Sequence, residues 1–100
     1  MTTASVIEKL KSPEIRSVFT RNHVRHAYLT GSFARGEAKE TSDLDIIYEK
    51  EAGASFTLFN IGDLKSSLEE AFGREVDLIS ESAIRKEIRE SILRDKKTVF

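Results

Sequence analysis

The sequence contains no cysteine. This absence excludes a disulfide framework, a thiolate metal site and a thiol nucleophile. It is consistent with a reducing compartment, and we expect a cytoplasmic protein. Any catalytic or metal-binding group must therefore come from hydroxyl, imidazole, carboxylate or basic side chains.

Long apolar runs are also missing. The N-terminal stretch MTTASVIEKLKSPE alternates charged and apolar residues, unlike a signal peptide or a membrane-spanning segment. No anchor is predicted elsewhere, so we expect no membrane partner. A single hydrophobic core suits a chain of this length, and we expect one domain over residues 1–100.

Neither sign of charge is in excess. The chain has 16 lysine and arginine residues against 17 aspartate and glutamate residues, for a net charge of −1. A broad nucleic-acid groove needs a clear positive excess. The charges are typical of a soluble globular surface, and we expect no direct binding of nucleic acid.

Helix and strand patterns alternate along the first half of the chain. A short helix is expected from Ser5 to Lys11, and a second begins at Ser12 as N-cap with Pro13 at the first helical position. Residues 24–29 suit a strand. Residues 44–48 form an apolar, β-branched run, which is typical of a strand covered on both faces.

The second half continues the alternation. Apolar residues at steps of three and four predict a helix that ends at Gly73: Ile61, Leu64, Leu68, Ala71 and Phe72. A strand over 75–79, a helix capped by Ser82 and a short strand or docked tail at 98–100 follow. This order predicts an α/β (α+β) fold, with a small mixed sheet flanked by helices.

The stretch GSFARGEAKETSDLDI, residues 31–46, carries the most chemical information. Asp43 and Asp45 lie two apart at the start of a strand, so both carboxylates are expected on one face. Two such charges repel each other unless a cation lies between them. Mg²⁺ favours a few carboxylates completed by substrate phosphates, although two aspartates at an exposed strand end need no metal.

Gly31 and Ser32 lie just upstream, between a strand and a helical turn. Glycine lets phosphate oxygens approach the backbone, and a helix N-terminus offers free N–H groups. An ordinary tight turn with a helix cap is the commoner reason for a Gly-Ser pair that stands alone. Arg35 suits either a phosphate contact or a surface charge.

A third acid, Asp77, lies in an apolar strand, where a carboxylate is costly unless it is paired or bound. If this strand neighbours 44–48, Asp77 points the same way as Asp43 and Asp45. Three acids would then hold two Mg²⁺ ions, one near the nucleophile and one near the leaving pyrophosphate. An exposed strand edge is the alternative.

These residues resemble the minimal nucleotidyltransferases of the polymerase β superfamily. The motif of that family is Gly-Ser, ten residues, then Asp-x-Asp. Here Gly31-Ser32 is followed by ten residues, 33–42, and then by Asp43 and Asp45. The third acid of the family maps to Asp77. The resemblance covers nearly the whole chain and implies a polymerase β-like core.

Two further positions match the small members of the family. Arg35-Gly36 fills the place of their Arg-Gly pair, and Ser42 that of the serine before the first aspartate. The resemblance implies catalytic and metal roles for Asp43, Asp45 and Asp77, with Gly31, Ser32, Arg35 and Ser42 binding the nucleotide. It also implies ATP as substrate and Mg²⁺ as cofactor.

The family further implies a partner. Its small members are often paired with a HEPN-domain protein as antitoxin and toxin, and some are thought to transfer AMP to a tyrosine of the toxin. The alternative is a binding module that neutralises its partner without catalysis. An antibiotic-modifying enzyme is a third reading, but the chain has no room for an acceptor domain.

Overall fold

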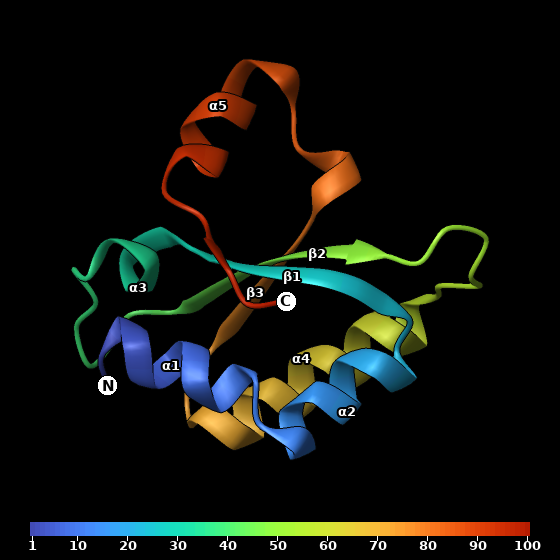
Figure 1. Cartoon of the computed structure of the whole chain (residues 1–100), viewed down its shortest axis with the longest axis horizontal. Coiled ribbons are helices and arrows are strands. Elements are labelled where there is room, and N and C mark those ends of the chain that lie inside the picture. The colour runs from blue at the N-terminus through green and yellow to red at the C-terminus, as the bar shows by residue number, and fades with distance from the viewer.

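A four-stranded mixed sheet forms the centre of the computed structural model, which describes residues 1–100 (Figure 1). Its strands are β1 (Val24–Thr30), β2 (Leu44–Lys50), β3 (Val76–Ser80) and β4 (Lys97–Thr98), in the order β3-β2-β1-β4. Strand β1 runs antiparallel to β2 and β4, whereas β2 and β3 are parallel. The predicted α/β fold with a mixed sheet is confirmed.

The helices lie on both sides of this sheet. They are α1 (Thr3–Leu10), α2 (Pro13–Arg21), α3 (Gly31–Arg35), α4 (Leu58–Phe72) and α5 (Lys86–Arg94), with a 3-10 turn, η1, at Glu81–Ala83. Helices α1, α2 and α4 cover one face, and α5 stands over the other (Figure 1). No helix is both long and apolar enough to cross a bilayer.

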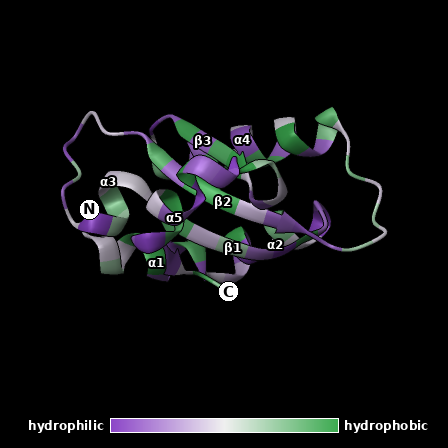
Figure 2. Cartoon of the chain, turned by 90° about the horizontal axis from the view of Figure 1, so that it is seen from above, coloured by the Kyte–Doolittle hydropathy of each residue, from purple (hydrophilic) through white to green (hydrophobic).

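The main core lies between the sheet and helices α1, α2 and α4. Phe19, Leu29, Ile46, Leu64 and Leu68 are fully buried there. Figure 2 looks down on the opposite side of the sheet, where α5 lies nearest the viewer. Burial on that side continues at Ile47, which is also fully buried but lies outside the main cluster. Strand β2 is therefore covered on both faces, as predicted.

Two helix starts differ from the sequence expectation. Helix α1 begins at Thr3 with Thr2 as its N-cap, and Ser5 is the reciprocal member of a capping box: the Ser5 amide donates to Thr2 Oγ1 at 3.0 Å. The last helix begins at Lys86 rather than after Ser82, because Ile84 and Arg85 are extended. The Ser82 prediction missed the 3-10 turn that precedes α5.

Candidate active site

Gly31 joins β1 to α3 and lies against Asp45. Its φ of +71° is in the left-handed region, which favours glycine. A Cβ at this position would overlap Asp45 Oδ2 and come within 3.0 Å of Asp45 Cγ. The backbone angle and the nearby Asp45 carboxylate therefore both require glycine at position 31.

The three predicted acids lie at the same end of the sheet. Asp45 of β2 pairs in register with Thr30 of β1 on one side and with Asp77 of β3 on the other. Asp43 lies in the loop, one residue before β2 begins. Asp45 is half-buried, whereas Asp43 and Asp77 are exposed. Asp77 is therefore the exposed edge acid of the cluster, and Asp45 is its desolvated member.

Burial and the close acids together raise the pKa of Asp45. Burial raises the pKa of Asp45 from 3.8 to about 6, and the negative charge of Asp77 is the next largest cause. A hydrogen bond with Asp77 and the charge of Asp43 raise this pKa further, while the positive charge of Arg35 lowers it. The fully ionised cluster is therefore unfavourable without a cation.

This donor set fits a divalent cation of the Mg²⁺ type, which takes a few carboxylates and completes its shell with phosphate oxygens and water. Nowhere in the chain do three histidine, aspartate or glutamate side chains converge closely enough to form a ready-made site. Nucleotide phosphates would have to complete the coordination. The metal roles of Asp43, Asp45 and Asp77 stay predictions.

A hollow of about 240 Å³ opens beside Gly31 and Asp45. It is lined by residues of β1, α3, β2, β3 and the α5 segment: Thr30, Gly31, Arg35, Asp45, Ile79, Ser91, Ile92 and Asp95. Thr30 Oγ1 donates to the Ile92 carbonyl at 3.3 Å, which ties α5 to this rim. A larger hollow of about 380 Å³, between the N-terminus and α3, contains none of the predicted ligands.

The remaining predicted nucleotide ligands are placed unequally. Arg35 is exposed on the rim of the hollow, and its Nε donates to Glu37 Oε2 at 3.1 Å. Ser32 is half-exposed at the start of α3. Ser42 does not line the hollow. Its hydroxyl accepts from the Lys39 amide at 2.8 Å and closes a turn. Its role in binding nucleotide stays a prediction.

Sequence reasoning missed Ser91 and Asp95, which line the hollow from the α5 segment. Both follow about fifty residues after the acidic motif, and they reach it only because the chain after β3 folds back over the sheet (Figure 1). The amphipathic spacing in this region predicted a helix, but it carries no information on which sheet positions the helix covers.

The sequence also matches a known protein family and a relative in that family. Residues 13–100 match the family described as Polymerase beta, Nucleotidyltransferase. The protein adenylyltransferase MntA of Thermococcus cleftensis is 35% identical over 95 residues, which cover 95% of this chain and 94% of that protein.

Solved structures show the same fold. A structure provisionally assigned as a minimal nucleotidyltransferase superposes with a TM-score of 0.78 at 33% identity, covering 97% of this chain and 95% of that one. A chain from a complex of a tri-AMPylated Shewanella oneidensis HEPN toxin with MNT antitoxin superposes with a TM-score of 0.64 at 18% identity, covering 93% and 71%. At that identity the second likeness concerns the fold alone.

Proposed function

This chain belongs to the polymerase β nucleotidyltransferase family and is a nucleotidyltransferase, and we propose that it moves AMP from ATP to a hydroxyl of a partner protein with the help of Mg²⁺. One observation carries the proposal: the Asp45 carboxylate lies against the Gly31 backbone and beside Asp77, at the rim of a hollow. The backbone proposed to bind phosphate and the acids proposed to bind metal thus meet at one point.

The nucleotide would bind along the start of α3. The first N–H groups of a helix have no partner within it and can donate to phosphate oxygens. Ser32 adds a hydroxyl donor, and Arg35 adds a positive charge on the rim. Asp43, Asp45 and Asp77 would hold Mg²⁺, which when bound neutralises the charge of the triphosphate and of the leaving pyrophosphate.

The reaction replaces a phosphoanhydride bond of ATP by a phosphoester bond to the acceptor. The acceptor hydroxyl oxygen bonds to the α-phosphorus of ATP, the bond from that phosphorus to the oxygen bridging to the β-phosphate breaks, and pyrophosphate leaves. The hydroxyl proton goes to a carboxylate, for which Asp77 is our candidate because its side chain is exposed and therefore accessible to an acceptor. Positioning and charge neutralisation would supply most of the rate.

The acceptor must be held by another molecule. Asp43 and Asp77 are exposed, and neither of them lines the hollow beside Asp45. We propose a HEPN-type toxin as the partner, in keeping with the complex named above. AMP on a tyrosine near the active site of that toxin would place bulk and negative charge where RNA phosphates bind, and would silence it.

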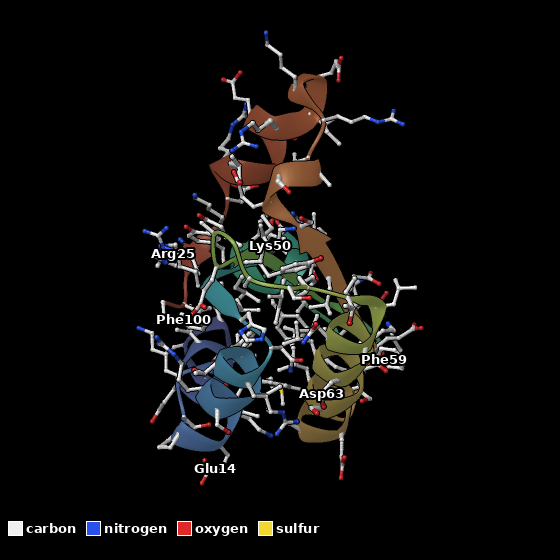
Figure 3. All side chains as sticks on the ribbon, turned by 90° about the vertical axis from the view of Figure 1, so that its right-hand side faces the viewer. Glu14, Arg25, Lys50, Phe59, Asp63 and Phe100 are labelled. Carbon is white, nitrogen blue, oxygen red and sulfur yellow. The ribbon has the colours of Figure 1, made fainter.

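A second function, neutralisation by binding alone, is favoured by one surface feature. Leu58 and Phe59 at the start of α4 are 84% and 89% exposed, and Phe59 points away from the helix bundle (Figure 3). Exposed apolar side chains next to each other favour protein contacts.

Intact mass spectrometry separates the two functions. The purified chain, a HEPN-type partner, ATP and Mg²⁺ are mixed, and the partner is weighed. A gain of one or more AMP units that disappears with Asp43→Asn supports transfer. A partner that is inhibited without any change in mass would replace the catalytic proposal with the binding one.

A further inference from the structure

Arg74 connects the turn before β3 to the loop that carries Asp43. It follows Gly73, which ends α4 in the left-handed conformation. Its Nη1 donates to the carbonyl of Ser42 at 3.0 Å. Ser42 directly precedes Asp43, so the Arg74 side chain holds the backbone of the loop that carries Asp43.

The same guanidinium also contacts α3. Its Cζ lies 4.8 Å from the ring centroid of Phe33, and Phe33 is only 2% exposed. An arginine over an aromatic face is attracted by the ring quadrupole. Because α3 begins at Gly31 and Ser32, Arg74 joins the helix proposed to bind phosphate to the loop proposed to bind metal.

A backbone hydrogen bond ties the residue on the other side of Asp43 to the start of β3. The Leu44 amide donates to the Glu75 carbonyl at 2.9 Å. Asp43 therefore lies between two residues that are tied to the start of β3, while Asp45 and Asp77 are paired in register just beyond. The exposed carboxylate of Asp43 makes no hydrogen bond of its own, so its position depends on these backbone ties.

Stability alone does not account for Arg74. Its Nε is buried and has no hydrogen-bond partner, which is unfavourable for a polar group. An apolar side chain would cover Phe33 without that penalty. An arginine at this position therefore needs another explanation, and the bond from its Nη1 to the Ser42 carbonyl supplies one.

We propose that Arg74 is a positioning residue, which sets the distance between the Asp43 loop and α3 so that one nucleotide and its cation can engage both. The inference rests on the proposed function. Arg74 does not contact the reacting atoms, and the hollow does not include it. It acts through Ser42 and Phe33.

The test compares Arg74→Met with a matched control, Arg16→Met. Arg16 of α2 also covers an aromatic ring, with its Cζ 3.7 Å from the centroid of Phe100, but it makes no contact with the Asp43 loop. Two readouts are measured: the affinity for a non-hydrolysable ATP analogue with Mg²⁺ by calorimetry, and hydrogen exchange of amides 37–44 without ligand.

We expect Arg74→Met to weaken analogue binding by about 10- to 100-fold, the usual effect of removing a group that orients a metal ligand. Amides 37–44 should exchange faster in this variant, and Arg16→Met should match the wild type in both readouts. Unchanged affinity and exchange in Arg74→Met, or an equal loss in Arg16→Met, would overturn the proposal.

Two further results, a wild type that does not bind the analogue and an Arg74→Met variant that does not fold, are judged by loop exchange. If the wild type itself does not bind the analogue, the proposed function fails, and exchange of amides 37–44 alone decides whether Arg74 holds the loop. If Arg74→Met does not fold, Arg74→Lys replaces it. Lysine keeps the charge over Phe33 but loses the planar fork, so faster loop exchange in that variant supports the proposal and unchanged exchange contradicts it.

Discussion

The carboxylate of Asp45 occupies the space that a side chain at residue 31 would need. A Cβ on Gly31 would lie 3.0 Å from Asp45 Cγ and 3.3 Å from Asp45 Cβ, and would overlap Oδ2. The Gly-Ser and Asp-x-Asp parts of the motif are therefore coupled by direct contact. The glycine has a structural reason to be there even before any phosphate binds.

Gly31→Ala should damage the site more than its backbone strain predicts. A non-glycine residue at positive φ costs about 1–2 kcal/mol, and here Asp45 must move as well. Gly53→Ala is the matched control, because Gly53 has a φ of +77° but nothing within 4 Å of an added Cβ. Thermal unfolding and calorimetry with ATP and Mg²⁺ should show destabilisation in both variants and loss of binding only at 31. Equal binding by both variants would argue against the Gly31–Asp45 coupling.

Asp45→Asn should stabilise the metal-free protein near neutral pH. The folded-state pKa of Asp45 is raised from 3.8 to about 6, so the folded protein binds more protons than the unfolded chain between these values. Its stability then falls as the pH rises through that window. Asparagine does not titrate, so the Asp45→Asn variant does not lose stability over this pH range.

Melting temperatures in the presence of a chelator test this pH dependence. The difference between Asp45→Asn and wild type should increase from pH 4 to pH 7 and then level off. A difference that stays constant, or that shrinks as the pH rises, would show that burial and the acidic neighbours do not raise the pKa of Asp45. Glu70→Gln is a control, since Glu70 is exposed on α4 and makes no ion pair.

The local patterns of the sequence account for most of the elements. Steps of three and four predicted α4, and alternating or continuous apolar runs predicted β1, β2 and β3, because burial follows the period of each element. The adjacency of Asp45 and Asp77 was expected only on the condition that β2 and β3 are neighbours, and the structure meets that condition.

Contacts between distant segments were not predictable in the same way. Ser91 and Asp95 reach the hollow because α5 folds back over β1, where Thr30 contacts the Ile92 carbonyl. Arg74 reaches Ser42 across 32 positions of sequence. Such contacts depend on the packing of whole elements, whereas propensity and periodicity describe only neighbours along the chain.

Asp63 should contribute to stability in a pH-dependent way. It accepts hydrogen bonds from Arg21 Nε at 2.8 Å and from Asn22 Nδ2 at 2.6 Å, which lower its pKa well below the usual range. Figure 3 shows Asp63 on the side of α4 that faces α2. A lowered folded-state pKa stabilises the protein above the unfolded value of about 3.9, and this contribution is lost as the pH falls further.

Asp63→Asn should therefore lower stability at pH 7 by about 1 kcal/mol, a modest value because the side chain is 38% exposed and solvent screens the pair. Urea unfolding at pH 7 and pH 3 measures the effect. The difference from wild type should narrow at pH 3. A deficit that is as large at pH 3 as at pH 7 would assign the effect to packing around Asn22 instead of to charge.

The aspartates of the motif should be needed for metal-dependent nucleotide binding and not for folding. The double variant Asp43→Asn, Asp45→Asn keeps the shape of both side chains and removes like charges, so its melting temperature should equal or exceed that of wild type. With ATP and Mg²⁺, calorimetry should show affinity at least about tenfold weaker than wild type, a difference of about 1.4 kcal/mol, because the ligands that share the cation with the phosphates are gone.

With ATP and a chelator, the order of the two affinities should reverse or the difference should vanish, since two fewer negative charges face the triphosphate. That reversal separates a metal site from a general defect, which would weaken binding under both conditions. Equal affinity of wild type and double variant in Mg²⁺ would remove Asp43 and Asp45 from the site, and an early-melting double variant would make them structural.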